Sequence, residues 1–123
     1  MEFNGESHKS FYEKYGSEYS GSDRQRQVLF YLLGVSDTTR HNIDAIYDFK
    51  EKCIIPESLS AGWQTSSSRA LTRLAFDLYH GDPVLADGVS DAEGELMMYS
   101  VSNIMSRLNE WLPFALEAIN ILY

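Results

Sequence analysis

The stretch SRALTRLAFDLYH, residues 68–80, carries the strongest structural signal in the 123-residue chain. Its apolar residues fall at the i, i+3, i+4 and i+7 positions that share one face of an α-helix. These residues are Leu71, Leu74, Ala75 and Leu78. Gly81 follows, and glycine commonly ends a helix because it adopts the left-handed conformation without strain. The pattern predicts an amphipathic helix whose apolar face packs against other helices.

The chain beyond this helix predicts two more helices. The sequence SDAE at residues 90–93 has the spacing of a capping box, so a helix is expected to begin there and run to about Leu108. Pro113 suits the first turn of a final helix over residues 112–123. That segment is rich in large apolar residues, namely Phe114, Leu116, Ile119, Ile121, Leu122 and Tyr123. A domain of this size cannot hide all of them, so we expect a homodimer formed through this helix.

The N-terminal part of the chain predicts shorter helices. Aromatic residues at helical spacing indicate a helix over residues 10–15, and residues 1–9 are expected to form a mobile N-terminus. A second helix follows a loop rich in serine and glycine. Ser22 or Asp23 is its expected N-cap, and Gly34 is its expected end.

A third helix is expected after Ser36 or Asp37, either of which can serve as its N-cap. The residues expected to point inward are Ile43, Ile46, Tyr47 and Phe49. Pro56 breaks the helical pattern, and residues 53–68 read as a long ordered loop or short strand. Together these elements predict an all-α fold, a compact single domain of five or six helices over residues 1–123.

The overall composition excludes several classes of protein. Ten Lys and Arg against 18 Asp and Glu give a net charge of −8, so direct binding to duplex DNA or an anionic membrane is not expected. The sequence has neither a signal-peptide pattern nor a membrane-length apolar run, which predicts a cytoplasmic protein. Cys53 is the single cysteine, so we expect no disulfide, no zinc site and no cofactor.

Acidic residues are unevenly distributed along the chain. Residues 1–73 hold ten acidic and nine basic side chains, whereas residues 74–123 hold eight acidic side chains and Arg107 as the single basic one. Carboxylates can take the place of phosphates on a basic groove, because electrostatic steering depends on charge distribution. We therefore expect a docking face for a host protein with a basic nucleic-acid-binding surface, formed by Asp82, Asp87, Asp91, Glu93 and Glu95. The alternative is a solvated acidic face that aids solubility.

The residues just before the central helix suggest a different kind of site. In GWQTSSSR, residues 62–69, hydroxyl groups gather at a helix N-terminus, where backbone amides and the helix dipole favour anions. A nucleotide or another phosphorylated ligand would be bound by Trp63, Gln64, Thr65, Ser66, Ser67, Ser68, Arg69 and Arg73. In the structural alternative, one hydroxyl caps the helix, Trp63 fills the core and Arg73 pairs with Asp77.

An enzymatic interpretation depends on Arg73 and His80. The pair resembles the Arg-x4–6-His motif of helical HEPN ribonucleases, in which the motifs of two protomers line one cleft and histidine acts as an acid or base. The resemblance covers these two residues, and Leu74 stands where those enzymes usually carry a polar residue. A HEPN-like ribonuclease is therefore the third functional hypothesis.

Two further reactive features have plain structural alternatives. His41, Asp44 and Asp48 are spaced so that they could hold a divalent ion, and a solvated helix face explains the same spacing. Cys53 has only lysines as basic neighbours, which favours a buried or bystander thiol over a nucleophile.

Two stretches together resemble a family of small uncharacterised proteins from Gram-positive bacteria and their mobile elements. They run from VLFYLLG to IYDFK, residues 28–50, and from GWQTSSSR to LAFDLY, residues 62–79. The resemblance implies no reaction and no catalytic residue. It implies a phage or mobile-element context, similar in kind to inhibitors of bacterial defence such as anti-CRISPR proteins. Charge and context together predict a non-enzymatic interaction protein that inhibits a host nucleic-acid-binding defence effector by occupying its basic surface.

Overall fold

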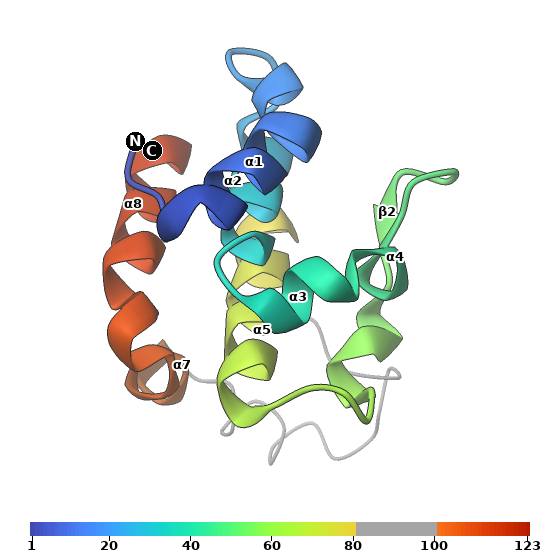
Figure 1. The fold of residues 1–123 in the computed structure, drawn as a ribbon, viewed down its shortest axis with the longest axis vertical. Coiled ribbons are helices and arrows are strands. Elements are labelled where there is room, and N and C mark those ends of the chain that lie inside the picture. Colours follow the sequence, from blue (N-terminus) through green and yellow to red (C-terminus); the bar gives the residue numbers. More distant parts are fainter. Residues whose placement is uncertain (81–100) are drawn as a thin grey trace.

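A computed structural model describes residues 1–80 and 101–123 of the chain. Its α-helices are α1 (Gly5–Tyr15), α2 (Arg24–Leu33), α3 (Asp37–His41), α4 (Ile43–Ile46), α5 (Ser66–His80), α7 (Val101–Leu108) and α8 (Leu112–Leu122). The other elements are the 3-10 helices η1 (Ser17–Tyr19), η2 (Pro56–Ser60) and η4 (Asn109–Trp111), and the strands β1 (Tyr47–Asp48) and β2 (Cys53–Ile54). Figure 1 shows a helical protein with one small hairpin, which confirms the predicted all-α fold.

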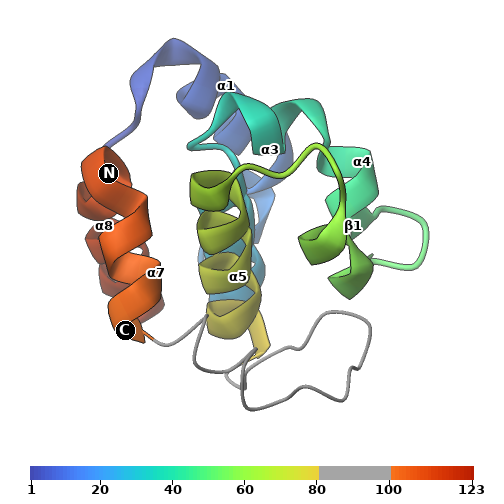
Figure 2. The same ribbon diagram turned by 90° about the horizontal axis from the view of Figure 1, so that it is seen from below.

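Helix α2 lies at the centre of the packing. All its residues from position 27 to position 33 are buried, and α1, α5 and α8 surround it (Figures 1 and 2). The predicted ends are confirmed, because Asp23 accepts a hydrogen bond from the Arg26 amide and Gly34 is the C-cap. Gln27 is the polar exception on this apolar helix, and its side-chain amide donates to the Tyr12 hydroxyl at 2.9 Å. A helix buried on every side needs such a partner for each polar group.

Helix α5 confirms the central sequence prediction and begins two residues earlier than expected. Thr65 and Ser68 cap it reciprocally: the Ser68 amide donates to Thr65 Oγ1 at 3.0 Å, and the Thr65 amide donates to Ser68 Oγ at 2.8 Å. This arrangement follows the logic of a capping box, with a serine in place of the usual glutamate. One face of α5 packs on α2 and another on α7.

The first helix is longer than the aromatic pattern predicted. It begins at Gly5, so residues 5–9 are helical and one of them, His8, is buried in the core, while the mobility expected for residues 1–9 stays a prediction. The reason for the earlier start is His8, whose side chain is fully buried. Its Nδ1 accepts a hydrogen bond from the Asn4 amide at 2.8 Å, and its Nε2 lies 2.7 Å from the carbonyl oxygen of Tyr31. Burial lowers the pKa of His8 to about 4, an effect partly offset by the Tyr31 hydrogen bond.

The third predicted helix is divided at Asn42 into α3 and α4, and the prediction is wrong beyond Ile46. The chain leaves the helix there and forms an antiparallel hairpin in which Tyr47 pairs with Ile54. The Asp48 carboxylate fixes the turn by accepting hydrogen bonds from the amides of Lys50 and Glu51, both at 3.0 Å. Phe49, expected in the core, is 39% exposed. The predicted loop over residues 53–68 contains β2, η2 and the first turn of α5.

The C-terminal part of the structure begins at α7. The predicted helix start at residues 90–93 lies outside the described residues, and the described helix ends at Leu108 as expected. Helix α8 carries Pro113 in its first turn, as predicted, and packs on α2. The N-terminal segment runs beside α8 (Figure 1), with the Tyr31 hydroxyl donating to the Glu2 carbonyl and the Met1 amine 3.9 Å from Glu117 Oε1. No helix in the described part of the chain is long and apolar enough to cross a membrane.

Candidate functional site

The predicted acidic docking residues Asp82, Asp87, Asp91, Glu93 and Glu95 lie outside the described residues. Their charge is a property of the sequence. Residues 81–100 contain these five acidic side chains and no basic one, so they account for −5 of the net charge of −8.

Most of the polar groups of the predicted ligand site serve the start of α5. Gln64 is buried, its side-chain nitrogen donates to the Ser58 carbonyl and to Thr72 Oγ1, and its side-chain oxygen accepts from Ser68 Oγ at 2.6 Å. Thr65 and Ser68 cap the helix as described above, while Trp63 packs partly buried against the core. These contacts match the structural alternative for the stretch, and the nucleotide-binding hypothesis stays a prediction.

The two arginines of that stretch lie on α5 in different environments. Arg73 is 1% exposed, and its Nε is 3.2 Å from Asp77 Oδ1, so the expected i,i+4 ion pair is present. Arg69 is half-buried, and its Nε has no hydrogen-bond partner among the described residues. Ser66 accepts a hydrogen bond from Arg107 of α7 at 2.6 Å, which ties the first turn of α5 to the C-terminal helices.

The enzymatic and metal hypotheses receive little support from the described geometry. Arg73, the arginine of the HEPN-like pair, is buried in an ion pair, and the side chain of His80 lies outside the described residues. The Asp48 carboxylate already accepts a hydrogen bond from the Lys50 amide in the hairpin turn. Within residues 1–80 and 101–123, no group of three His, Cys, Asp or Glu side chains could hold a metal ion. Cys53 is exposed, so the bystander interpretation of this thiol fits and the buried one does not.

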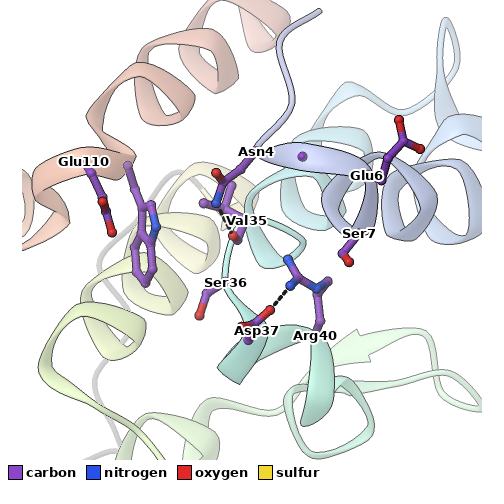
Figure 3. Close-up of a pocket in the computed structure, with 10 residues that line it drawn as sticks. Asn4, Glu6, Ser7, Val35, Ser36, Asp37, Arg40 and Glu110 are labelled. Atoms are coloured by element: carbon purple, nitrogen blue, oxygen red, sulfur yellow. Dashed lines mark hydrogen bonds and ion pairs between the residues drawn. The ribbon is translucent and has the colours of Figure 1, made fainter.

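A cavity between α1, α3 and η4 brings together residues from three separate parts of the chain and is taken as the candidate site. It has a volume of about 340 Å³. Its walls are formed by Asn4, Gly5, Glu6 and Ser7 of α1 and its N-cap, Val35, Ser36, Asp37 and Arg40 around α3, and Glu110 and Trp111 of η4. Figure 3 shows Arg40 and Glu110 on opposite sides of this opening. We call this cavity the α1–α3 pocket.

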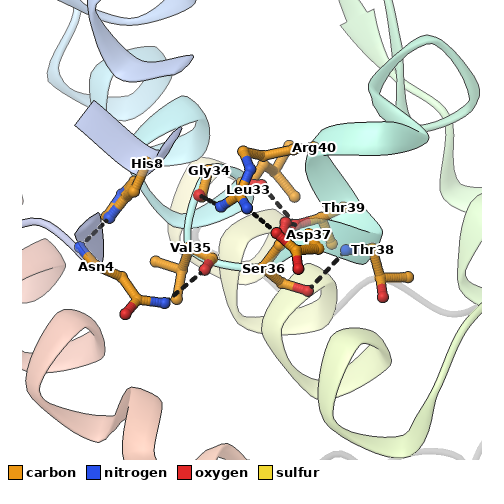
Figure 4. A network of polar contacts seen from close by, with 10 residues as sticks. All are labelled: Asn4, His8, Leu33, Gly34, Val35, Ser36, Asp37, Thr38, Thr39 and Arg40. Carbon is orange, nitrogen blue, oxygen red and sulfur yellow. Dashed lines mark hydrogen bonds and ion pairs between the residues drawn. The ribbon is translucent and has the colours of Figure 1, made fainter. Parts of the chain in front are cut away.

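A polar network makes the floor of the α1–α3 pocket rigid (Figure 4). Arg40 donates from Nη1 to the Gly34 carbonyl at 2.7 Å, and its Nη2 pairs with Asp37. Asn4 donates from its side chain to the Val35 carbonyl at 2.9 Å. Arg40 therefore holds the turn between α2 and α3. Its positive charge is balanced by Asp37.

Two carboxylates at the α1–α3 pocket remain without a cation. Glu6 and Glu110 are both exposed, and neither pairs with any basic group of the described residues. Trp111, which lines the same cavity, is half-buried. A tryptophan face beside uncompensated carboxylates suits a cationic side chain, because the ring quadrupole and the negative charge both attract it.

The α1–α3 pocket continues in two directions. A cavity of about 370 Å³ shares Glu110 and Trp111 with it and reaches Ser67 at the start of α5. Another of about 460 Å³ shares Glu6, Ser7 and Arg40 and extends to Lys14 and Tyr15 on α1. Because these cavities share lining residues, they adjoin one another along α1, α3 and η4, and we call them together the groove.

No sequence motif marks this groove. Its walls come from residues 4–7, 35–40 and 110–111, which are far apart in the chain and show no common motif. Ser36 and Asp37 were recognised as helix caps, and the Ser36 hydroxyl does accept a hydrogen bond from the Thr38 amide. The local pattern does not indicate that this cap lines the same cavity as Trp111.

Comparison with other proteins identifies a family and no function. No curated protein and no solved structure matches the chain. The resemblance to uncharacterised proteins extends over the whole chain and beyond the span of about residues 24–81 that the sequence motifs suggested. The chain belongs to the family of unknown function DUF6075, which matches residues 1–123.

Proposed function

We propose that this protein is a non-enzymatic interaction protein that docks on a basic surface of a nucleic-acid-binding partner. The observation that carries the proposal is the α1–α3 pocket, whose lining includes Trp111 and the carboxylates Glu6 and Glu110, and whose own arginine is engaged by Asp37. A lysine or arginine of the partner would enter beside Trp111 and restore charge balance.

The charge distribution supports the same function. Three arginines of the described residues are already engaged by acids close to them in sequence, namely Arg26 with Asp23, Arg40 with Asp37 and Arg73 with Asp77. The negative surplus therefore belongs to other carboxylates, above all the five at residues 82–95. Long-range attraction by this surplus accelerates association with a basic surface, and the pocket adds a short-range contact that selects side chains.

The identity of the partner is the finer part of the proposal. A protein whose own surface binds nucleic acid carries the arginines and lysines that such a groove accepts. We propose that the partner is a host defence effector and that the protein is encoded by a phage or mobile element. Occupying the basic surface would exclude nucleic acid by direct competition, as anti-CRISPR proteins can do.

The pocket is tested by titrating a fluorescent hexa-arginine peptide and following its anisotropy at two salt concentrations. The double variant Glu6→Gln/Glu110→Gln is expected to weaken binding by about tenfold, because it removes both uncompensated carboxylates from the lining of the pocket. Trp111→Phe is expected to weaken it by a few-fold, since phenylalanine is a weaker cation acceptor than tryptophan.

The matched control is Glu13→Gln/Glu18→Gln. It removes the same two charges from exposed positions that line neither the pocket nor its extensions. General attraction by net charge would make both double variants weaken binding equally, and that result would remove the pocket from the proposal. Neutralising the five carboxylates at residues 82–95 measures their contribution to peptide affinity in the same assay. Peptide binding that survives both this change and the Glu6→Gln/Glu110→Gln change contradicts the docking function.

A further inference from the structure

Helix α8 carries an apolar stripe on the side turned away from the core. Leu112, Leu116 and Tyr123 are 37%, 58% and 87% exposed, and Ile119 between them is half-buried. We call these four residues the α8 stripe. The side facing the core consists of the buried residues Phe114, Ala115 and Ala118. Helix α8 lies at the outer edge of the molecule in both ribbon views (Figures 1 and 2).

The spacing of the α8 stripe fits a second helix of the same kind. Positions 112, 116, 119 and 123 are separated by four, three and four residues, as in the apolar seam between two packed helices. This spacing is the same when it is counted from either end. A two-fold axis midway along an antiparallel pair would therefore place Leu116 opposite Ile119 of the other copy, and Leu112 opposite Tyr123.

Charge does not oppose such a contact, although each copy carries a net charge of −8. The exposed side chains of α8 and its C-cap are all uncharged at neutral pH: Leu112, Pro113, Leu116, Asn120 and Tyr123. Glu117 is the single charged side chain within α8, and its position in the helical turn places it on a different face from the α8 stripe. Its carboxylate is 3.9 Å from the Met1 amine, so its charge is compensated within the same copy.

We infer that the α8 stripe is the interface of a homodimer in which two α8 helices pack antiparallel about a two-fold axis. The stripe exposes roughly 400 Å² of mainly apolar surface, which is within the size range of the largest apolar patch on a typical monomer, a patch that is often functional. A standard interface buries about 800 Å² per partner. Because the stripe supplies about half of that area, we expect a weak dimer with a dissociation constant on the order of 10–100 μM.

Sedimentation velocity of the full chain from about 5 μM to about 500 μM brackets that affinity. The wild-type protein is expected to shift from monomer to dimer across the range. Leu116→Glu is expected to remain monomeric throughout, because it places a carboxylate of each copy into an apolar seam. Gln25→Glu is the matched control: it adds the same charge at an exposed position of α2 and is expected to dimerise like wild type. A monomeric wild type at the highest concentration, or a Leu116→Glu variant that dimerises normally, overturns the inference.

The antiparallel register has its own test. Leu116→Glu and Ile119→Lys are each expected to be monomeric alone, and a one-to-one mixture is expected to form heterodimers because residue 116 of one copy faces residue 119 of the other. A mixture that stays monomeric, or one that associates no better than Leu116→Glu mixed with wild type, contradicts this register. Circular dichroism of each variant confirms that it is folded. The interface goes beyond the proposed docking function, and its assay contains no basic partner, so the two proposals can fail independently.

Discussion

The ring Nε2 of His8 lies 2.7 Å from the carbonyl oxygen of Tyr31, inside the contact between α1 and α2. Because a carbonyl oxygen only accepts hydrogen bonds, Nε2 must carry the proton, and Nδ1 is then the neutral acceptor for the Asn4 amide at 2.8 Å. Both ring nitrogens are used in the neutral form. Protonation of Nδ1 would break the Asn4 bond and put a charge in the core.

The first prediction concerns the pH dependence of stability. Burial lowers the pKa of His8 from 6.5 to about 4 in the folded protein, so the unfolded chain binds more protons between these pH values. The His8 contribution to the free energy of unfolding is therefore complete above pH 6.5 and is lost as the pH falls to about 4. With about 1.4 kcal/mol per pH unit, the total loss is about 3 kcal/mol.

Urea unfolding at a series of pH values measures this dependence. His8→Gln keeps a side chain that can donate to the Tyr31 carbonyl but does not titrate, so its stability is expected to change less between pH 6.5 and 4. His41→Gln removes an exposed histidine from α3 and is expected to follow the wild-type curve. If the free energy of unfolding of wild type and of His8→Gln changes with pH in parallel, His8 does not contribute to the pH dependence and the prediction is wrong.

The second prediction concerns the close approach of α1 to the end of α2. A Cβ on Gly34 would lie 2.7 Å from Cδ1 of Phe11 and 2.9 Å from Cδ2 of His8, shorter than any normal contact. Gly34→Ala is therefore expected to destabilise the fold by about 1–3 kcal/mol, because the two rings are packed in the core. Gly62→Ala is the control, since its Cβ would meet no atom within 4 Å. Thermal unfolding of both variants measures the difference, and equal midpoints would contradict the tight contact.

The sequence predicted the parts of the fold that depend on local chemistry. Helices α2 and α5 have clear periodicity, and the caps at Asp23 and Ser36 are short-range hydrogen bonds that a local pattern can reveal. His8 was missed because a polar side chain in the core is satisfied by Tyr31, which is 23 residues away. For α8, the excess of apolar residues was evident, but tertiary packing decides that Phe114 is buried and Leu116 exposed.

The candidate site was predicted less well for the same physical reason. The α1–α3 pocket depends on how η4 is placed against α1 and α3, and no spacing in the sequence encodes that contact. Hydroxyl groups before α5 gave a strong local signal for an anion site, although the cap and the Gln64 network account for several of them. The local motif therefore marks a helix start, whereas the cavity depends on tertiary contacts.

A third prediction concerns how the hairpin is held against α2. Arg26 donates from Nε to the Tyr47 hydroxyl at 3.1 Å and from Nη2 to the Lys52 carbonyl at 2.8 Å. Its guanidinium also lies 5.9 Å and 5.8 Å from the ring centres of Tyr19 and Tyr79. A lysine keeps the charge but cannot make this forked set of bonds. Arg26→Lys is therefore expected to destabilise the protein by about 1–2 kcal/mol.

Hydrogen exchange locates this effect. The Lys52 amide donates to the Asp48 carbonyl within the turn at 2.7 Å, and its exchange is expected to accelerate in Arg26→Lys more than exchange in α5 does. Arg24→Lys is the matched control, because Arg24 is exposed and its side chain has no hydrogen bond or ion pair within the described residues. Uniform acceleration across the protein would mean that Arg26 supports the whole fold and not the hairpin in particular.

The last prediction separates the two interpretations of the residues before α5. If Thr65 is an N-cap, its hydroxyl satisfies the Ser68 amide, and Thr65→Ala leaves that donor without its partner. The expected loss is about 1 kcal/mol in the free energy of unfolding. Ser67→Ala, two residues away, removes a hydroxyl with no hydrogen bond among the described residues and is expected to change stability by less than about 0.5 kcal/mol.

In a phosphate site both hydroxyls would be ligands. Both variants would then keep the stability of the free protein, and both would lose the extra stabilisation that added inorganic phosphate or nucleotide gives the wild type. Denaturant unfolding with and without these anions distinguishes the cases: a stability loss confined to Thr65→Ala, with no effect of the anions on the wild type, assigns the stretch to helix capping.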